Sequence, residues 1–255
     1  MVALFLAVAL AVAAVSAIRG VWSPCGLSML SSITPMTEAG RGNRFRTTAA
    51  WFVVGAVLGG LSIGALAALA AVGVAAADLS ETTRYAIAAV IAIGTAAVDL
   101  GVFGIELPIF KRQVNDAWLR TYRSWVYGAG FGWQIGFGVA TYIMTAGVFL
   151  TIALAVLTAS PLQALVIGLV FGLVRGSAVH IGRNATTPAA LGRVHERLDA
   201  AAPAARTAAL GIQVAAAAVL ASFAWHPLVG AALAAAGIAV VLVGRSAPSA
   251  AALRS

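Results

Sequence analysis

The feature that most constrains the fold of this chain is the alternation of long apolar runs with short basic segments. An apolar run of about 20 residues is long enough for a helix to cross the hydrocarbon core of a bilayer. Seven stretches fit this description, at residues 2–36, 48–77, 84–106, 124–157, 161–181, 207–223 and 227–244. We therefore expect an integral membrane protein with about six or seven transmembrane helices.

The composition supports helices in lipid as the form of these runs. Hydrophobic residues make up 62% of the chain and charged residues only 9%, whereas soluble domains carry roughly 25% charged residues. In a bilayer, backbone polar groups must be satisfied within helices or a closed barrel. Runs rich in Ala, Leu, Val and Gly favour helices, since barrel strands alternate polar and apolar residues. The expected fold is an all-α bundle forming a single transmembrane domain over residues 1–255.

The distribution of charge predicts the orientation of the chain. Of the 16 Lys and Arg residues, 13 lie in segments 37–47, 107–123 and 182–206 and in the tail after residue 244, whereas the intervening loops carry none. Cytoplasmic loops are enriched in cations, so the N-terminus should be outside and the C-terminus cytoplasmic. Because the net charge of +8 is spread over several loops, lipid and not nucleic acid is the expected partner. The excess of Arg and Ala is typical of GC-rich bacteria, which favours the bacterial inner membrane.

Two segments have more than one interpretation. The segment 182–206 is polar enough to leave the bilayer, and we interpret it as a solvated cytoplasmic loop, with a short surface helix at 194–201 as the alternative. The run ending Ala14-Val15-Ser16-Ala17 resembles a small-residue cleavage site of a signal peptide. Because no basic segment precedes it, we favour retention of residues 1–17.

An internal repeat is suggested by two motifs that lie 111 residues apart, one beginning at Trp22 and one at Trp133. The same offset takes the start of the second crossing to the start of the fifth. Three crossings per half would give halves of inverted topology at 1–110 and 111–223, followed by an extra helix at 227–244. Repeats of this kind place a functional site near the midplane, on discontinuous helices.

The first apolar stretch should contain such a discontinuous helix. At 35 residues it is too long for one straight crossing, and Arg19, Pro24, Gly26 and Pro35 interrupt it. Proline removes a backbone donor and breaks the helix, and non-helical backbone at membrane depth must be buried in protein or line a cavity.

Cys25, the one cysteine of the chain, lies at this predicted break. A break gives partners access to the thiol, and a helix N-terminus that follows favours the nucleophilic thiolate. In the alternative interpretation, Cys25 is a small apolar packing residue.

The run Trp22-Ser-Pro-Cys-Gly-Leu-Ser-Met29, with Pro35 downstream, resembles the first membrane helix of the cytochrome c biogenesis and disulfide reductase transmembrane family (CcdA and the DsbD core). The glycine after the cysteine is closer to the methylamine-utilisation MauF-like branch. The three-plus-three arrangement, Phe131-Gly132-Trp133 and the glycine-rich run 168–176 agree with this resemblance, although only Ser-Pro-Cys is specific.

The resemblance implies electron transfer between thiols. Members of the family carry electrons from cytoplasmic thioredoxin to extracytoplasmic thiol proteins through one cysteine on the first helix and one on the fourth. Cys25 matches the first, but Gly136 stands where the second is expected. One thiol can form a mixed disulfide but cannot complete a dithiol cycle alone.

The predicted function is therefore support of thiol-disulfide electron transfer, or of maturation of an extracytoplasmic protein of the cytochrome or amine-dehydrogenase type. A thioredoxin-like or other thiol protein would supply the second cysteine. The candidate catalytic residue is Cys25, and no cofactor or metal is expected. An accessory scaffold and a transporter on the same fold remain as alternatives.

Charged residues inside the crossings carry the transporter alternative. An intramembrane carboxylate is costly and should face a partner inside the bundle; for Asp99 the best partner is Arg175. Such a pair could stabilise the bundle, or it could serve a proton or ion step in a secondary transporter. The candidate binding residues are Pro24, Gly26, Trp133, Gln134, Gly136, Asp99 and Arg175.

Overall fold

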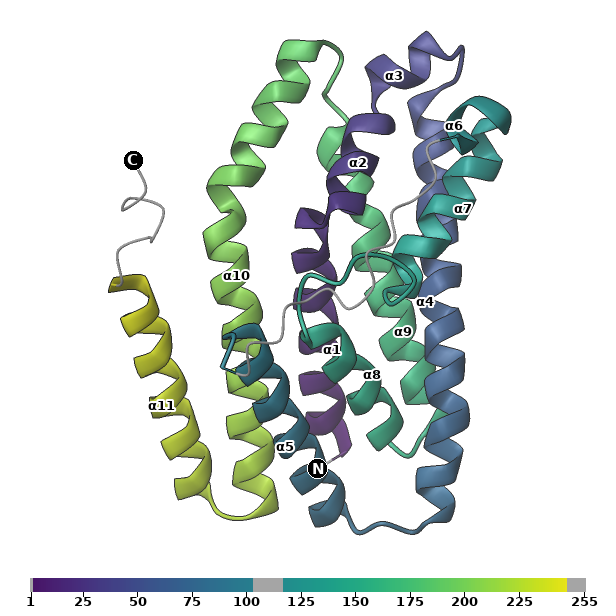
Figure 1. Ribbon diagram of the computed structural model, residues 1–255. Coiled ribbons are helices and arrows are strands. Elements are labelled where there is room, and N and C mark those ends of the chain that lie inside the picture. The colour runs from purple at the N-terminus through teal and green to yellow at the C-terminus, as the bar shows by residue number, and fades with distance from the viewer. Residues whose placement is uncertain (1, 103–116, 247–255) are drawn as a thin grey trace.

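The computed structural model describes residues 2–102 and 117–246, and this part of the chain is helical without any strand (Figure 1). The elements are α1 (Val2–Arg19), the 3₁₀ turn η1 (Gly20–Trp22), α2 (Pro24–Ser32), α3 (Pro35–Gly40), α4 (Phe45–Ala76), α5 (Glu81–Asp99), α6 (Trp118–Thr121), α7 (Ser124–Phe137), α8 (Gly147–Leu157), α9 (Pro161–Ser177), the 3₁₀ turn η2 (Ala178–Gly182), α10 (Pro188–Ala224) and α11 (Pro227–Ser246). The all-α prediction is confirmed for these residues.

Four of the described helical segments are long and apolar enough to cross a membrane. They are Ala3–Trp22, Phe45–Ala76, Pro161–Gly182 and Pro188–Ala224, and the shorter apolar helices Gly147–Leu157 and Pro227–Gly237 accompany them. The described part of the chain is thus all-helical, and the length and composition of its helices are those of a membrane protein. Six or seven crossings and the inverted repeat stay predictions.

The predicted break of the first stretch is present. Pro24 is the first residue of α2 and Pro35 the first residue of α3, positions where the missing proline amide leaves no helical hydrogen bond unmade. The side chains of Ser23 and Thr34 cap the two helices by accepting backbone N–H groups, as N-cap residues do. Proline and cap residue together therefore fix where each short helix begins.

The stretch 124–157 is not one continuous helix, which corrects the sequence interpretation. It divides into α7 and α8, separated by residues 138–146, and Gly138 after the end of α7 has a φ of 81°, a left-handed conformation that glycine adopts without strain. A helix therefore ends inside the bundle without any proline in the sequence to mark it.

The segment 182–206 is likewise not a loop. After η2, the 37-residue helix α10 begins at Pro188 and continues through Pro203 into the predicted sixth crossing, 207–223. Pro203 is exposed. Because proline has no N–H, the carbonyl group four residues earlier has no helical donor, and water can donate to it instead. The Ala-rich sequence on both sides favours helix strongly enough to continue past it.

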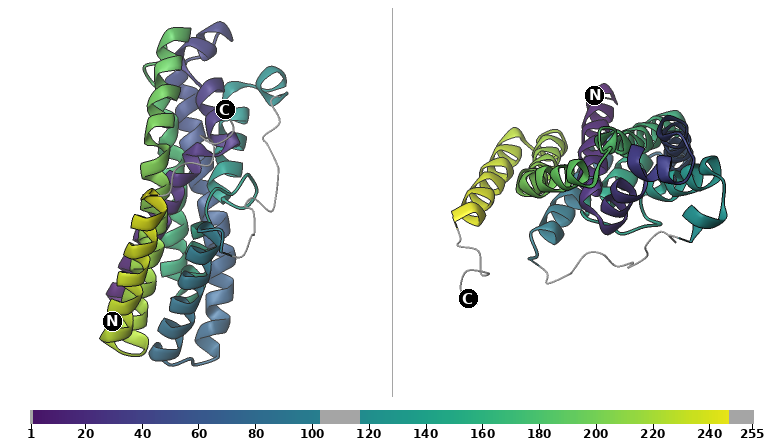
Figure 2. Two further views of the ribbon diagram at one scale, coloured as in Figure 1. Left: turned by 60° about the vertical axis from the view of Figure 1, so that its left-hand side comes forward. Right: turned by 90° about the horizontal axis from the view of Figure 1, so that it is seen from above.

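Glycines bring α4 into close contact with α7 and α9. A Cβ added at Gly60 would overlap the Gly168 carbonyl oxygen, and one added at Gly168 would overlap that of Gly60. Small residues in this register let helix backbones approach closely in a membrane. The layer of three helices made by α4, α7 and α9 forms one side of the bundle (Figures 1 and 2).

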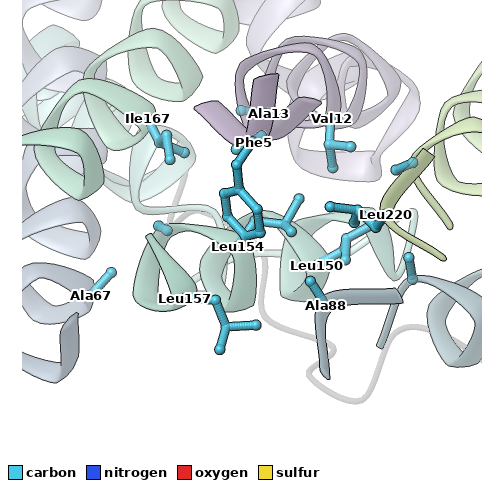
Figure 3. Packing of buried hydrophobic residues seen from close by; sticks show 14 of the residues in the cluster. Phe5, Val12, Ala13, Ala67, Ala88, Leu150, Leu154, Leu157, Ile167 and Leu220 are labelled. Carbon is cyan, nitrogen blue, oxygen red and sulfur yellow. The ribbon is translucent and has the colours of Figure 1, made fainter. Parts of the chain in front are cut away.

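The main hydrophobic core lies around α1 and α8 (Figure 3). Phe5, Leu150, Leu154 and Leu220 are almost completely buried there, and they come from α1, α8 and α10. Residues 2–17, for which cleavage was considered, therefore supply part of the core in this fold.

Candidate functional site

The Ser-Pro-Cys-Gly motif forms the first turn of α2. Ser23 Oγ accepts the Gly26 N–H at 3.0 Å, and a Cβ at residue 26 would overlap the Val21 carbonyl oxygen. Each residue of the motif thus helps to start a helix immediately after the break. Cys25 in this turn is only 2% exposed, so the thiol points into the protein.

Arg175, near the end of α9, reaches the same break from a helix that packs against α1. Its side chain is 4% exposed, and its Nε donates to the Ile135 carbonyl at 2.9 Å. Nη1 donates to the Ala17 carbonyl at 3.4 Å. A Cβ at Gly20 would overlap the guanidinium group, so the glycine of η1 makes the space that Arg175 fills.

The two acceptors of Arg175 lie in the last turns of α1 and α7, where helix carbonyls lack partners within the helix. A cation at a helix C-terminus also interacts favourably with the helix dipole. Arg175 therefore joins the broken first crossing to the end of α7, and this explains a buried arginine in an apolar helix.

The Cys25 thiol lies within electrostatic range of the Arg175 guanidinium group. During disulfide exchange a sulfur carries negative charge as it attacks or leaves, and a fixed cation beside it stabilises that charge. The structure thus brings together Cys25 and Arg175, which the sequence assigned to separate hypotheses.

The other predicted binding residues do not gather around Cys25 in the same way. A Cβ at Gly136 would overlap the Ala56 carbonyl oxygen, so the position expected for a second cysteine is directed at α4. Trp133 is 41% exposed, and its Nε1 donates to Ser62 Oγ at 3.1 Å. Gln134 is half-buried. Pro24 and Gly26 position Cys25 through the helix start described above.

The expected ion pair between Asp99 and Arg175 is wrong. Asp99 accepts hydrogen bonds from the Thr145 hydroxyl, from the Ala146 N–H at 2.7 Å and from Gln213 Nε2 at 2.7 Å. The Ala146 amide lies at the beginning of α8, so the carboxylate caps a helix that starts inside the bundle. Arg175 binds carbonyl groups at the ends of α1 and α7, and Asp99 binds an amide group at the beginning of α8, so each has hydrogen-bond partners without the other.

Glu38 is a buried polar residue that the sequence did not single out. It is fully buried, accepts hydrogen bonds from Thr48 Oγ1 at 2.6 Å and from the Tyr127 hydroxyl at 2.6 Å, and forms an ion pair with Arg41 at 2.8 Å. This is the single ion pair among residues 2–102 and 117–246. It ties α3 to α4 and α7. The signal in the sequence was a lone carboxylate in the basic segment 37–47.

The fold and this site define a class: a helical membrane protein in which two apolar stretches are interrupted and a buried thiol lies within electrostatic range of a buried arginine. Among known proteins, the chain is similar to the methylamine utilization protein MauF of Paracoccus versutus. The identity is 29% over 159 residues, which cover 60% of this chain and 57% of that protein, so less than two thirds of the relative is represented.

This similarity supports the MauF-like branch of the resemblance. No protein-family model and no solved structure matches the chain. The relation to CcdA and DsbD stays a prediction.

Proposed function

We propose that this chain supports the maturation of an extracytoplasmic amine-dehydrogenase-type protein in methylamine utilisation. The similarity to MauF carries this proposal. The protein would be a multi-pass protein of the bacterial inner membrane, with its N-terminus outside and its C-terminus in the cytoplasm, because its basic segments lie on one side of the predicted crossings.

Within that role, Cys25 exchanges disulfides with a cysteine of a partner protein. The Cys25 thiolate attacks one sulfur of a partner disulfide, a new S–S bond forms, and the old one breaks to release the second partner sulfur as a thiolate. A thiol of a reduced thioredoxin-like protein then attacks the partner sulfur of the mixed disulfide and releases Cys25 as a thiolate. The second thiol of the thioredoxin-like protein breaks the S–S bond just formed, so that the partner leaves as a dithiol and the thioredoxin-like protein as a disulfide. That reductant supplies the electrons, so the missing second cysteine in this chain is replaced by one on the partner.

The position of Cys25 suits a guarded thiol of this kind. Since the residue is 2% exposed, a partner sulfur reaches it only when α2 moves away from the bundle. The nine-residue α2 and the preceding turn are held to α10 by two hydrogen bonds, from Trp22 Nε1 to the Leu198 carbonyl at 2.8 Å and between Ser31 and His195 at 3.2 Å. Displacing α2 breaks these two hydrogen bonds and uncovers Met29 and Leu30, which pack in a hydrophobic cluster, so the open state should be a minor one.

The experiment measures active methylamine dehydrogenase in cells that carry the wild-type chain, Cys25→Ser, Cys25→Ala or no chain. We expect active dehydrogenase to fall strongly in both variants, and acid-quenched alkylation to trap a mixed disulfide in the wild type alone. Met29→Leu, a change of similar volume in the same helix, serves as the control.

Two outcomes would contradict different parts of the proposal. Full activity with Cys25→Ser would eliminate the thiol step but keep the maturation role. Full activity without the chain would eliminate the maturation role itself.

A further inference from the structure

A polar cavity lies between α1, α5 and α10, next to the break that follows α1. It has a volume of about 220 Å³ and is lined by the charged residues Arg19, Asp99 and Arg206 and by the apolar residues Val98, Met144 and Leu210. This volume is several times the share of one water molecule, about 30 Å³. The cavity can therefore hold a polar group larger than a single water molecule.

The charges around this cavity are not balanced within the described part of the protein. Arg19 and Arg206 lie close enough to repel each other, and neither forms an ion pair with a residue in 2–102 or 117–246. Asp99 adds one negative charge, but both of its oxygens already accept hydrogen bonds from protein donors. An anion between the two guanidinium groups would relieve their repulsion.

The depth of the cavity in the bundle indicates where such an anion comes from. The N-terminal ends of α1 and α5 and the C-terminal end of α10 lie at the same end of the bundle (Figure 1). Arg19 and Asp99 close α1 and α5, while Arg206 precedes the last 18 residues of α10. At ~1.5 Å per residue each charge is about 27 Å from that end, close to the ~30 Å thickness of the hydrocarbon core. With that end of the bundle placed at one layer of lipid headgroups, the three charges would lie near the opposite layer.

We propose that this cavity binds the phosphate group of an anionic phospholipid between Arg19 and Arg206. Guanidinium groups bind phosphate oxygens through paired, charge-assisted hydrogen bonds, and basic pockets between transmembrane helices hold anionic headgroups. The apolar lining by Val98, Met144 and Leu210 suits the glycerol end of a lipid better than a hydrated free ion. The proposal is independent of the maturation role.

Native mass spectrometry of the full chain in detergent tests it, with phosphatidylglycerol and phosphatidylcholine offered separately. The wild type should retain phosphatidylglycerol in preference to phosphatidylcholine. The double variant Arg19→Gln/Arg206→Gln should lose about tenfold or more in phosphatidylglycerol affinity, since two charge-assisted contacts disappear. The matched control Arg193→Gln/Arg197→Gln removes the same charge from α10 outside the cavity and should bind as the wild type does.

Any of these results would overturn the proposal: equal retention of the two lipids by the wild type, wild-type binding of phosphatidylglycerol by the Arg19→Gln/Arg206→Gln variant, or an equal loss in the control. Displacement of the lipid by millimolar inorganic phosphate would assign the cavity to the free ion and overturn the lipid source. Should the double variant not fold, Arg206→Gln replaces it, because Arg206 is exposed and its single loss should still lower phosphatidylglycerol affinity several-fold.

Discussion

At the break after α1, a cation donates hydrogen bonds to backbone carbonyl groups. At the break before α8, an anion accepts a hydrogen bond from a backbone amide group. Arg175 donates to Ala17 and Ile135 in the last turns of two helices. Asp99 accepts the amide of Ala146 at the beginning of a third. Both arrangements follow the polarity of the helix, which is positive at its N-terminus and negative at its C-terminus.

The two breaks differ in their surroundings. Arg175 is buried beside Cys25, whereas Asp99 is half-buried and lines a cavity. Water can replace a lost contact at the second break but not at the first. Charged residues inside an apolar bundle can therefore be explained by the helix ends to which they bind. The burial of each charged residue decides how much stability is lost when it is replaced.

The largest effect is expected from Arg175→Met. Removing the guanidinium group leaves the carbonyls of Ala17 and Ile135 without this donor in a dry site, which should lower the free energy of unfolding by about 2–4 kcal/mol. Arg84→Met is the matched control, since Arg84 donates to the carbonyls of Leu157 and Thr158 but is half-buried. That control should lose about 1 kcal/mol or less, measured by thermal unfolding in detergent.

Equal losses in the Arg175 and Arg84 variants would break the comparison. They would show that water reaches the first break as easily as it reaches the end of α8.

A smaller loss is expected from Asp99→Ala, about 1–3 kcal/mol, because the Ala146 amide, Thr145 and Gln213 lose their acceptor. Asp99→Asn keeps one acceptor oxygen for the amide and should lose less. Amide hydrogen exchange at the start of α8 checks both variants, with faster exchange expected in Asp99→Ala. Unchanged exchange would separate Asp99 from the capping of α8.

Gly136→Cys sharpens the comparison at the first break. Because a Cβ at residue 136 overlaps the Ala56 carbonyl, we expect a loss of about 1–3 kcal/mol from overpacking and no disulfide with Cys25 after mild oxidation. Counting free thiols by mass spectrometry measures the second point. Gly73→Cys, where an added Cβ has no neighbour within 4 Å, is the control for stability. A disulfide between Cys25 and the thiol introduced at position 136 would show that the dithiol pair of the resembling family can be restored.

The smallest effect on stability is expected from Cys25→Ser. The change conserves volume and alters one polar atom, so the free energy of unfolding should change by about 1 kcal/mol or less, although we expect maturation activity to fall. A large loss of stability would instead identify Cys25 as a packing residue. The Cys25→Ala variant would then show whether maturation activity falls because of the lost thiol or because of lost stability.

The sequence predicted the elements that local chemistry marks. Pro24 and Pro35 each follow a capping residue, and both begin helices as expected. The break at 138–146 contains no proline and no charged residue. It depends on contacts with Asp99 and Gln213 from distant helices, which a local sequence pattern does not show. The segment 182–206 was assigned to a loop by its charge, but charge indicates solvent and not the absence of a helix.

The candidate site was only partly predictable for a related reason. We expected Asp99 to pair with Arg175 because buried charges are usually paired with opposite charges. That expectation left out the backbone N–H and C=O groups at interrupted helix ends, which can bind a buried charge instead. The proximity of Cys25 to Arg175 arises because η1 and α9 pack together, through a glycine whose role no sequence pattern indicates. Glu38 escaped notice since a single carboxylate among arginines is usually solvated.

Helix α10 fixes the distance between the two breaks. Its N-terminal half contacts the segment at the first break through Leu198 and His195, and its C-terminal half contacts the second break through Gln213. From Leu198 to Gln213 there are 213 − 198 = 15 residues, or about 22 Å of helix. One inserted residue would turn one end by about 100° relative to the other, so no register could keep both attachments.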